Sequence, residues 1–375
     1  MTFETNISKM FGIKHPIFSA AMGPFYTTDL CVAVSEAGGL GVLSHTSIER
    51  GADITRETTE EDIEIDETTM RRTRIDVVKA MKANMEFVVE HTDKPFGFNI
   101  RTSRNEISAP KLCSEIPKFI MENQRIRDQC IYALTSAGSS KILPSSKTFQ
   151  ELKEKSEIKH FHVAPALWLA DKCVASGVDG MVVTGGEGGG HQSYEKTSTL
   201  VLLQQVHQKY PDFPIIACGG FATGAGLAAA LSMGAGGIAM GSRFIASKDS
   251  EFHENYKGVV PPSKASDTIL VTGALGPIRL WRNDYSLHHG LVADKDAKIA
   301  EEERLRSMSR EDYIKELIAS SNAYLAAYRG DVNSGAVLLG QSIGIINSIE
   351  SVSDIIEGMV SEAESLLKNA TGKIR

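Results

Sequence analysis

The chain has 375 residues, of which 42% are hydrophobic and 23% charged, as in an ordinary soluble globular protein. Its 40 Lys and Arg residues against 47 Asp and Glu residues give a formal charge of -7, which argues against nonspecific nucleic-acid binding. No stretch is apolar enough to span a bilayer, and the first residues lack a signal-peptide core. The five cysteines form no CxxC pair, so we expect no disulfide framework, no metal site and a reducing cytoplasmic location.

Short apolar runs alternate with helical patterns along the first 246 residues. Strands that are apolar on both faces and joined by helices indicate a parallel sheet covered on both sides. Eight such units favour a closed α/β barrel, the (β/α)8 or TIM barrel, over an open doubly wound sheet. The expected strands are residues 17–21, 41–44, 96–100, 129–134, 159–163, 180–184, 214–218 and 237–240; the expected helices are 28–37, 114–122, 145–155, 165–176, 199–209 and 223–233.

Two regions depart from this repeat. An insertion at residues 48–94 follows the second strand, with an acidic stretch and then a helix expected at 69–91. It could be a lid over the barrel mouth, or equally a solvated excursion. Residues 247–375 are expected to form a helical appendage packed on the barrel (residues 1–246), with a helix near 251–256, a strand and turn at 267–280, and helices at 301–329 and 343–368.

The sixth expected strand ends in a glycine-rich loop, TGGEGGGH, at residues 184–191. Glycines remove side chains from the strand end, so that a flat or phosphorylated ligand can lie against the backbone. The loop closes on His191, whose imidazole can exchange a proton near neutral pH. A lone histidine is more often structural, but its place behind the glycines favours an open, substrate-facing role. Glu187 could orient it or tune its pKa.

Similar bare segments follow the seventh and eighth strands, at residues 218–224 and 240–244. Loops at these two positions of a parallel barrel commonly build a phosphate site from backbone N–H groups and a helix amino terminus. Gly219, Gly220, Gly241 and Ser242 are therefore candidate donors to a phosphate monoester. Because tight turns also need glycines, neither segment alone indicates a phosphate site. The occurrence of both segments at the last two strands supports this prediction.

The first and third strands end in residues that suit a flat ring. Residues 19–24 run Ser-Ala-Ala-Met-Gly-Pro, which leaves room over the barrel mouth. Asn99 ends the third strand, and its amide can both donate and accept toward a heterocycle. By itself Asn99 is better explained as a turn residue at the end of a strand, and only its agreement with the other strand ends favours a binding role.

Taken together, these segments resemble the nitronate monooxygenase (2-nitropropane dioxygenase) family, which includes the FMN-dependent enoyl-ACP reductases as relatives. The likeness rests on residues 16–41, 94–99, 187–191, 218–222, 240–244 and 340–344. The resemblance implies a (β/α)8 barrel that binds FMN, with His191 as the catalytic residue. It assigns the cofactor site to Ala20, Ala21, Met22, Gly23, Asn99, Thr184, Gly189, Gly190, Gly219, Gly220, Gly241 and Ser242.

The resemblance implies an FMN-dependent oxidoreductase that oxidises a small carbanionic substrate, a nitronate, with O2. The alternative is a reductase of an α,β-unsaturated CoA or acyl-carrier thioester, or of a quinone, with NADH or NADPH as donor. Arg71, Arg72 and Arg74 could then contact a phosphorylated carrier, although a solvated helix face explains them as well. A flavin-binding barrel without turnover is a third hypothesis. The expected partner is a small molecule, with no nucleic acid and no membrane, and a homodimer is left open.

Overall fold

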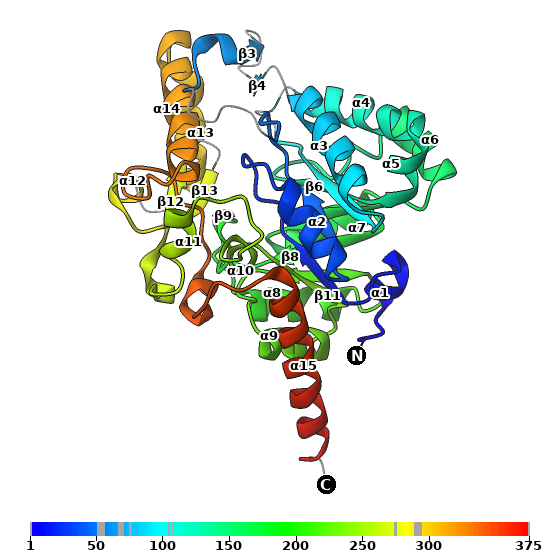
Figure 1. Ribbon diagram of the computed structural model, residues 1–375. Helices are drawn as coiled ribbons and strands as arrows, with labels where there is room; N and C mark the ends of the chain where they lie inside the picture. Colours follow the sequence, from blue (N-terminus) through cyan, green and yellow to red (C-terminus); the bar gives the residue numbers. More distant parts are fainter. Residues whose placement is uncertain are drawn as a thin grey trace.

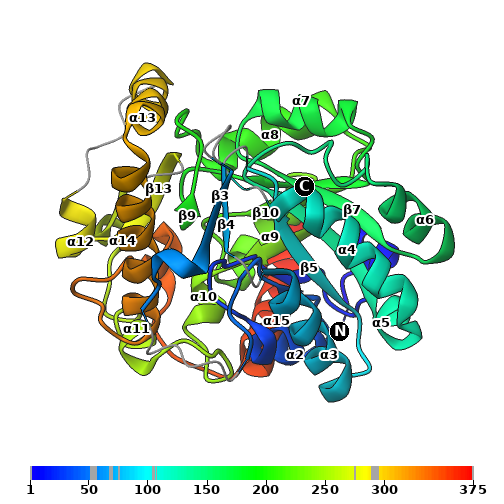
Figure 2. The same cartoon turned by 90° about the horizontal axis from the view of Figure 1, so that it is seen from above.

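The computed structural model describes residues 2–50, 57–66, 71–74, 77–103, 106, 108–273, 276–288 and 295–373. Eight parallel strands pair in the order β1-β11-β10-β8-β7-β6-β5-β2. An isolated bridge between Phe18 and Leu40 joins the two ends of this sheet. The fold is therefore the predicted (β/α)8 TIM barrel, as Figures 1 and 2 show. Its strands are β1 (Ile17–Ser19), β2 (Gly41–Leu43), β5 (Phe96–Arg101), β6 (Cys130–Ser136), β7 (Lys159–Ala164), β8 (Gly180–Thr184), β10 (Ile215–Cys218) and β11 (Gly237–Met240).

The barrel encloses an apolar interior that a short amino-terminal helix helps to fill. Phe18, Tyr132 and Phe161 point inward from three strands and meet Phe11 of α1 (Asn6–Phe11). Ring centroids lie 5.3 Å apart for Phe11 and Tyr132 and 5.7 Å for Phe11 and Phe18, both edge to face, a favourable arrangement for aromatic pairs. The interior is thus a packed core, and the site must lie at one of its ends.

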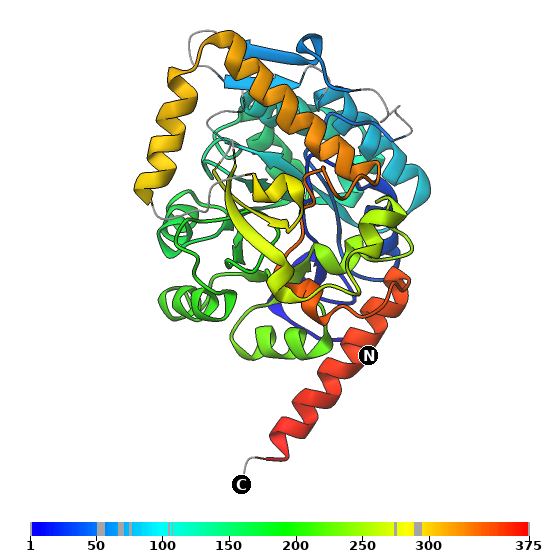
Figure 3. The same ribbon diagram turned by 90° about the vertical axis from the view of Figure 1, so that its left-hand side faces the viewer.

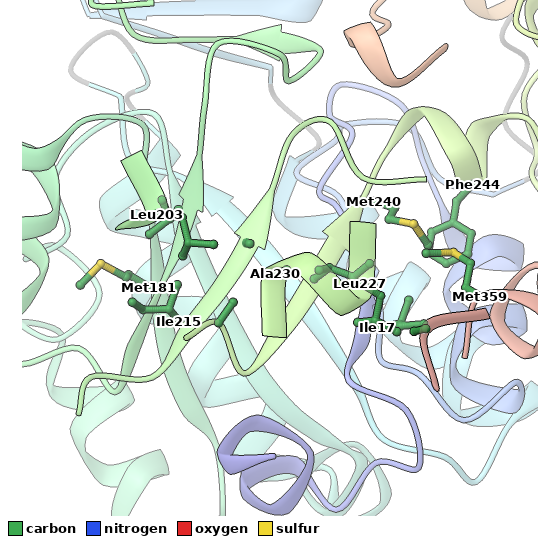
Figure 4. Close-up of a cluster of buried hydrophobic side chains, with 14 of the residues drawn as sticks. Ile17, Met181, Leu203, Ile215, Leu227, Ala230, Met240, Phe244 and Met359 are labelled. Carbon is green, nitrogen blue, oxygen red and sulfur yellow. The ribbon is translucent and has the colours of Figure 1, made fainter. Parts of the chain in front are cut away.

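Helices cover the outer face of the barrel, and all six helices that were predicted between the strands are present. They are α2 (Thr28–Glu36), α4 (Ser108–Glu122), α6 (Lys147–Lys155), α7 (Leu167–Ala175), α8 (Thr199–Lys209) and α9 (Gly224–Ser232), with α3 (Val77–His91) and α5 (Gln124–Gln129) beside α4. Figure 4 shows their apolar side chains against the sheet, with Met181 and Ile215 beside Leu203 of α8, and Ile17 beside Leu227 of α9.

After β11 the chain forms a segment that lies outside the eight-stranded sheet. It first forms α10 (Ser242–Ile245), α11 (Glu254–Gly258), η2 (Ala265–Asp267), the hairpin β12 (Thr268–Gly273) and β13 (Gly276–Trp281), α12 (Asp284–Leu287), α13 (Lys295–Ser307), α14 (Arg310–Tyr328) and η3 (Gln341–Ile345). Then α15 (Val352–Thr371) packs between α9 and α2, and Met359 joins the same apolar cluster (Figure 4). The predicted division of the chain at residue 246 stays a prediction.

Several predicted helices have different bounds in the structure, and the helix expected at 114–122 begins at Ser108. Residues 71–74 form β4 (Arg71–Arg74), which pairs with β3 (Ile63–Asp66), so the helix expected at 69–91 begins only at Val77. The helix expected at 301–329 is two helices, because the Ser309 hydroxyl caps α14 by accepting from the Asp312 N–H. Ser351 caps α15 in the same way, so the helix expected at 343–368 is interrupted after η3.

The insertion and the carboxyl-terminal segment meet on one side of the barrel. Thr58 donates its N–H to the Asn322 side chain of α14 at 2.7 Å, and the Asn322 amide donates to the Thr58 carbonyl at 3.3 Å. Figures 1 and 3 show α14 beside the β3–β4 hairpin. The side chains of Arg71, Arg72 and Arg74 lie outside the described part of the structure, as do residues 51–56 and 67–70.

We predict that Met359→Ala lowers the free energy of unfolding by about 2–5 kcal/mol, because it removes a buried side chain from the contact between α15 and the barrel. Urea unfolding followed by circular dichroism measures this loss. Ser361→Ala, on the exposed side of the same helix, is the control and should change stability by less than about 0.5 kcal/mol. Equal stability of the two variants would mean that α15 does not stabilise the barrel.

Candidate active site

A cavity of about 960 Å³ opens at the carboxyl ends of the barrel strands. This volume lies at the upper end of the range for small-molecule sites. The structure brings all thirteen residues predicted for the site to its wall. They are Ala20, Ala21, Met22, Gly23, Asn99, Thr184, Gly189, Gly190, His191, Gly219, Gly220, Gly241 and Ser242.

His191 belongs to a two-residue strand that the sequence did not predict. This strand, β9 (Gly190–His191), pairs antiparallel with β13, placing His191 opposite Ile278 and Gly190 opposite Arg279. Arg279 also donates from Nε to the Gly186 carbonyl at 2.7 Å. The half-buried imidazole at the cavity wall is therefore held by a hairpin from the carboxyl-terminal segment, about 90 residues further along the chain.

The Glu187 carboxylate binds the amino terminus of α8. Its Oε2 accepts from the Thr199 N–H at 2.8 Å and from the Thr199 hydroxyl at 3.0 Å, at the first residue of α8. A carboxylate at this position satisfies an N–H group that has no partner within the helix and favours the helix dipole. The sequence left Glu187 as a candidate partner of His191; the structure gives its Oε2 a capping role.

The glycine loop fits closely against residues 339–341 of the carboxyl-terminal segment. A Cβ on Gly189 would lie 2.7 Å from the Gly340 nitrogen, and a Cβ on Gly340 would lie 2.7 Å from the Glu187 carbonyl oxygen. Hydrogen bonds complete the contact, from the Gln341 N–H to the Glu187 carbonyl at 2.8 Å and from the Gly340 N–H to the Ser242 hydroxyl at 2.9 Å. Glycine at 189 is therefore required by backbone packing.

The ends of β10 and β11 leave their backbone open toward the cavity. Gly219 and Gly220 have φ of +91° and +88°, a conformation that side chains other than glycine rarely adopt. A Cβ on Gly241 would meet only ordinary contacts, the Ala20 Cβ at 3.8 Å and the Met22 sulfur at 3.9 Å. Backbone at these positions can approach a ligand that a side chain would keep away.

The amino terminus of α9 is partly occupied by a protein carboxylate. The Gly224 N–H donates to Glu362 of α15 at 2.7 Å, so this group is taken from the predicted phosphate site. The anion-binding capacity that remains on this wall is the backbone of Gly219, Gly220 and Gly241 and the Ser242 hydroxyl.

Asn99 is 2% exposed and is oriented by the neighbouring strand. Its Nδ2 donates to the Leu134 carbonyl at 3.2 Å and to the Ser136 hydroxyl at 3.1 Å. Two hydrogen bonds to β6 fix the plane of the amide at the cavity wall. A residue that only forms a turn would not need its side-chain amide to be oriented in this way.

A charged cluster on the same wall was missed by the sequence analysis. Arg101, two residues after Asn99, has its guanidinium 3.5 Å from Glu106, and the Glu106 carboxylate lies 3.6 Å from Nε2 of buried His45. Burial raises the pKa of Glu106, but contacts with His45 and Arg101 outweigh it and bring the pKa to about 2. Burial and the Arg101 charge lower the pKa of His45. The cluster therefore presents a paired cation and anion to the cavity at neutral pH.

All five cysteines are free thiols. Within the described ranges, no group of three or more His, Cys, Asp or Glu side chains could hold a metal ion. Searching the same residues for a helix that could cross a membrane finds none.

Most of the chain matches the model of one known protein family. The family model described as nitronate monooxygenase matches residues 4–362. The chain belongs to the nitronate monooxygenase family. The resemblance drawn from the glycine segments is thereby confirmed, and the protein is an oxidoreductase by its family and by the names of its relatives.

Proteins with similar sequences or structures are named after different activities. A Rhodococcus jostii protein named (3aS,4S,5R,7aS)-5-hydroxy-7a-methyl-1-oxo-octahydro-1H-indene-4-carboxyl-CoA dehydrogenase is 28% identical, and the alignment covers 100% of this chain and 99% of the relative. The nitronate monooxygenase of Paraburkholderia phytofirmans is 26% identical over 98% of this chain and 96% of its own. Among solved structures, FabK from Thermotoga maritima is 27% identical, covers 100% of both chains and has a TM-score of 0.73.

We predict that Arg279→Ala lowers the free energy of unfolding by about 1–3 kcal/mol, because the Gly186 carbonyl loses a charged donor. Hydrogen exchange at residues 186–191 should become faster, since the glycine loop loses one of its links to β13 and keeps only the backbone pairing. Arg282→Ala, whose side chain is exposed in the same segment, is the control and should leave both measurements unchanged. Unaltered exchange in Arg279→Ala would show that the hairpin does not hold the loop.

Proposed function

We propose that the protein is an FMN-dependent oxidoreductase that acts on a CoA thioester. The observation that carries the proposal is the convergence of three bare strand ends on one large cavity with His191 at its wall. The substrate class is supported by the Rhodococcus jostii relative, whose name ends in carboxyl-CoA dehydrogenase and whose sequence aligns over both full lengths.

The residues present fit the cofactor. Gly219, Gly220, Gly241 and Ser242 offer open backbone and a hydroxyl that would hold the phosphate. Ala20, Ala21, Met22, Gly23, Asn99 and Thr184 line the part of the cavity where small side chains and an oriented amide suit a flat ring. Gly189 and Gly190 would border the ribityl chain. When bound, FMN supplies the two-electron redox chemistry that no side chain offers.

His191 would move the proton that accompanies this redox chemistry. In reduction of an α,β-unsaturated thioester, its imidazolium gives a proton to the α carbon, and in the reverse direction the neutral imidazole removes that proton. The pairing of β9 with β13 fixes the residue at the cavity wall, as a general acid–base group requires.

The part of the cavity wall that α13 and α14 form suits an apolar acyl group. Leu305 of α13 and Tyr313 of α14 line it and pack together with Leu317. These helices belong to the carboxyl-terminal segment that meets the insertion, so we propose that the two together form a cover over the substrate. NADH or NADPH is the proposed electron donor.

Nitronate monooxygenase activity is the second candidate. It is supported by the description of the family and by the Paraburkholderia phytofirmans relative, which aligns over nearly its full length. In this reaction His191 would stabilise the anionic substrate at the cavity wall. The two candidates share the FMN site and differ in the substrate that oxidises or reduces it.

We predict that His191→Ala slows reoxidation of the photoreduced flavoprotein by an enoyl-CoA about 100- to 10,000-fold, because the proton donor at the α carbon is lost. Anaerobic stopped-flow absorbance measures this rate. His91→Ala, which removes an exposed histidine at the end of α3, is the matched control and should keep the wild-type rate.

The same apparatus separates the candidates. Wild-type protein that is reoxidised by enoyl-CoA supports the thioester reaction. Flavin that is reduced by a preformed nitronate but not reoxidised by enoyl-CoA would instead support the second candidate. Flavin that responds to neither, nor to NADH or NADPH, would mean a binding protein without turnover.

We predict that Gly241→Ala weakens FMN binding about tenfold or more, because the new methyl group occupies space at the open backbone of the phosphate site. The apoprotein should keep its thermal stability, since the surrounding protein atoms accept a Cβ at 3.8 Å. Fluorescence titration of apoprotein with FMN gives the affinity. Gly258→Ala, where a Cβ meets no atom within 4 Å, is the control. Wild-type affinity in Gly241→Ala would remove this residue from the cofactor site.

A further inference from the structure

Part of the cavity wall is formed by residues outside the predicted site. They are residues 137–141, in the loop after β6, and Pro165, Trp168, Leu169, Lys172 and Ser176 around α7. We call this part the lysine arm, after Lys141 and Lys172, which both line it. Figure 2 shows α7 at the rim of the barrel, beside α8.

Hydrogen bonds hold the two walls of the lysine arm together. Ser140 and Ser176 share a hydrogen bond of 2.7 Å between their hydroxyls. The Ser176 hydroxyl donates to the Lys172 carbonyl at 2.6 Å, so Ser140 is the donor to Ser176, and its oxygen lies 3.3 Å from the same carbonyl. The loop that carries Lys141 is thereby fixed to the turn of α7 that carries Lys172, so two cations from different elements face one cavity.

The same loop is anchored to the barrel on its other side. The Ser139 N–H donates to the Thr102 carbonyl at 3.3 Å, and a Cβ on Gly138 would lie only 1.8 Å from that oxygen. The loop is therefore packed directly against the end of β5. This close packing fixes the backbone at Lys141 beside the cavity.

The lysine arm carries net positive charge in a chain with a formal charge of -7. Among the described residues, no carboxylate lies within 4.0 Å of the ammonium group of Lys141 or Lys172. His162, which also lines the arm, adds no charge at neutral pH, because burial lowers its pKa to about 4. Most lysines are solvated surface groups, but these two are unpaired and share a concave wall, which favours an anionic ligand.

An exposed indole lies beside the cations. Trp168, at the start of α7, is 39% exposed and lines the arm, and the Lys172 ammonium lies 4.5 Å from its ring centroid. A large aromatic side chain that is left uncovered at a cavity can stack on a nucleobase. Cations next to such a platform suit the phosphates that a nucleotide carries.

We propose that the lysine arm binds the phosphorylated adenosine of CoA, with Lys141 and Lys172 contacting its phosphates and Trp168 stacking on its adenine. This inference rests on the proposed function and names the part of the substrate that the arm would recognise. The acyl thioester would then reach along the same cavity to His191. A phosphorylated adenosine also occurs in NADPH, so the experiment separates the two sources.

The probe is adenosine 3′,5′-bisphosphate, which carries the base, the 3′-phosphate and one of the two 5′-phosphates of CoA, without its thioester arm. Isothermal titration of the FMN-loaded protein should give an affinity that falls about tenfold in Lys141→Ala/Lys172→Ala, with smaller losses in each single variant. Binding to the wild type should weaken as salt rises, because the contacts are ionic. Lys111→Ala/Lys118→Ala, with two exposed lysines of α4 outside the cavity, removes the same charge and should bind normally. Trp168→Ala should also weaken binding.

A second measurement separates failure of this inference from failure of the proposed function. Reoxidation by an enoyl thioester of N-acetylcysteamine, which lacks the nucleotide, should be equal in the wild type and the double lysine variant. If the double lysine variant loses bisphosphate binding, but neither it nor the wild type turns over the thioester, the result supports the lysine arm and overturns the proposed function. Wild-type bisphosphate affinity in the double variant, or no binding to the wild type, would overturn the arm. A KM for NADPH that rises in the double variant, with unchanged affinity for the bisphosphate, would assign the arm to the dinucleotide and also overturn the inference.

Discussion

Close approach of two backbones is the constraint on which the candidate site depends. The glycine loop after β8 and residues 339–341 pack so tightly that a Cβ at Gly189 or Gly340 would overlap the other chain segment. Their hydrogen bonds and the β9–β13 pairing tie three parts of the chain into one wall. Because backbone groups form this wall, its shape hardly depends on side-chain rotamers, and His191 is held on rigid structure.

The carboxyl-terminal segment serves the barrel at two places that are far apart. At the mouth it supplies β13, Arg279 and Gly340, which position the glycine loop, and the helices that carry Leu305 and Tyr313. On the outer face it supplies α15, which packs against α9 and α2, while Glu362 binds the first N–H group of α9. The polypeptide between β11 and α15 therefore connects the stability of the barrel to the geometry of the cavity.

Charge is distributed unevenly around the cavity. Arg101 and Glu106 form a paired, half-buried cluster beside Asn99, whereas Lys141 and Lys172 are unpaired among the described residues and face the outer arm. Paired charges orient neighbouring groups with little net field, and unpaired charges attract an anion. This arrangement matches a substrate with an uncharged reacting end and a phosphorylated far end.

The sequence by itself determined the barrel and its eight strands, because strand and helix periodicities are local patterns. Its resemblance to a known family then named thirteen residues that the structure places on the cavity wall. It could not place Arg279, Gly340, Glu362 or Lys172, since each acts on a segment far away along the chain. It also merged helices that Ser309 and Ser351 separate, because a cap is a single hydroxyl inside a continuous helical pattern. Only the tertiary structure decided which loops touch, since contact between distant backbones depends on the packing of the whole barrel.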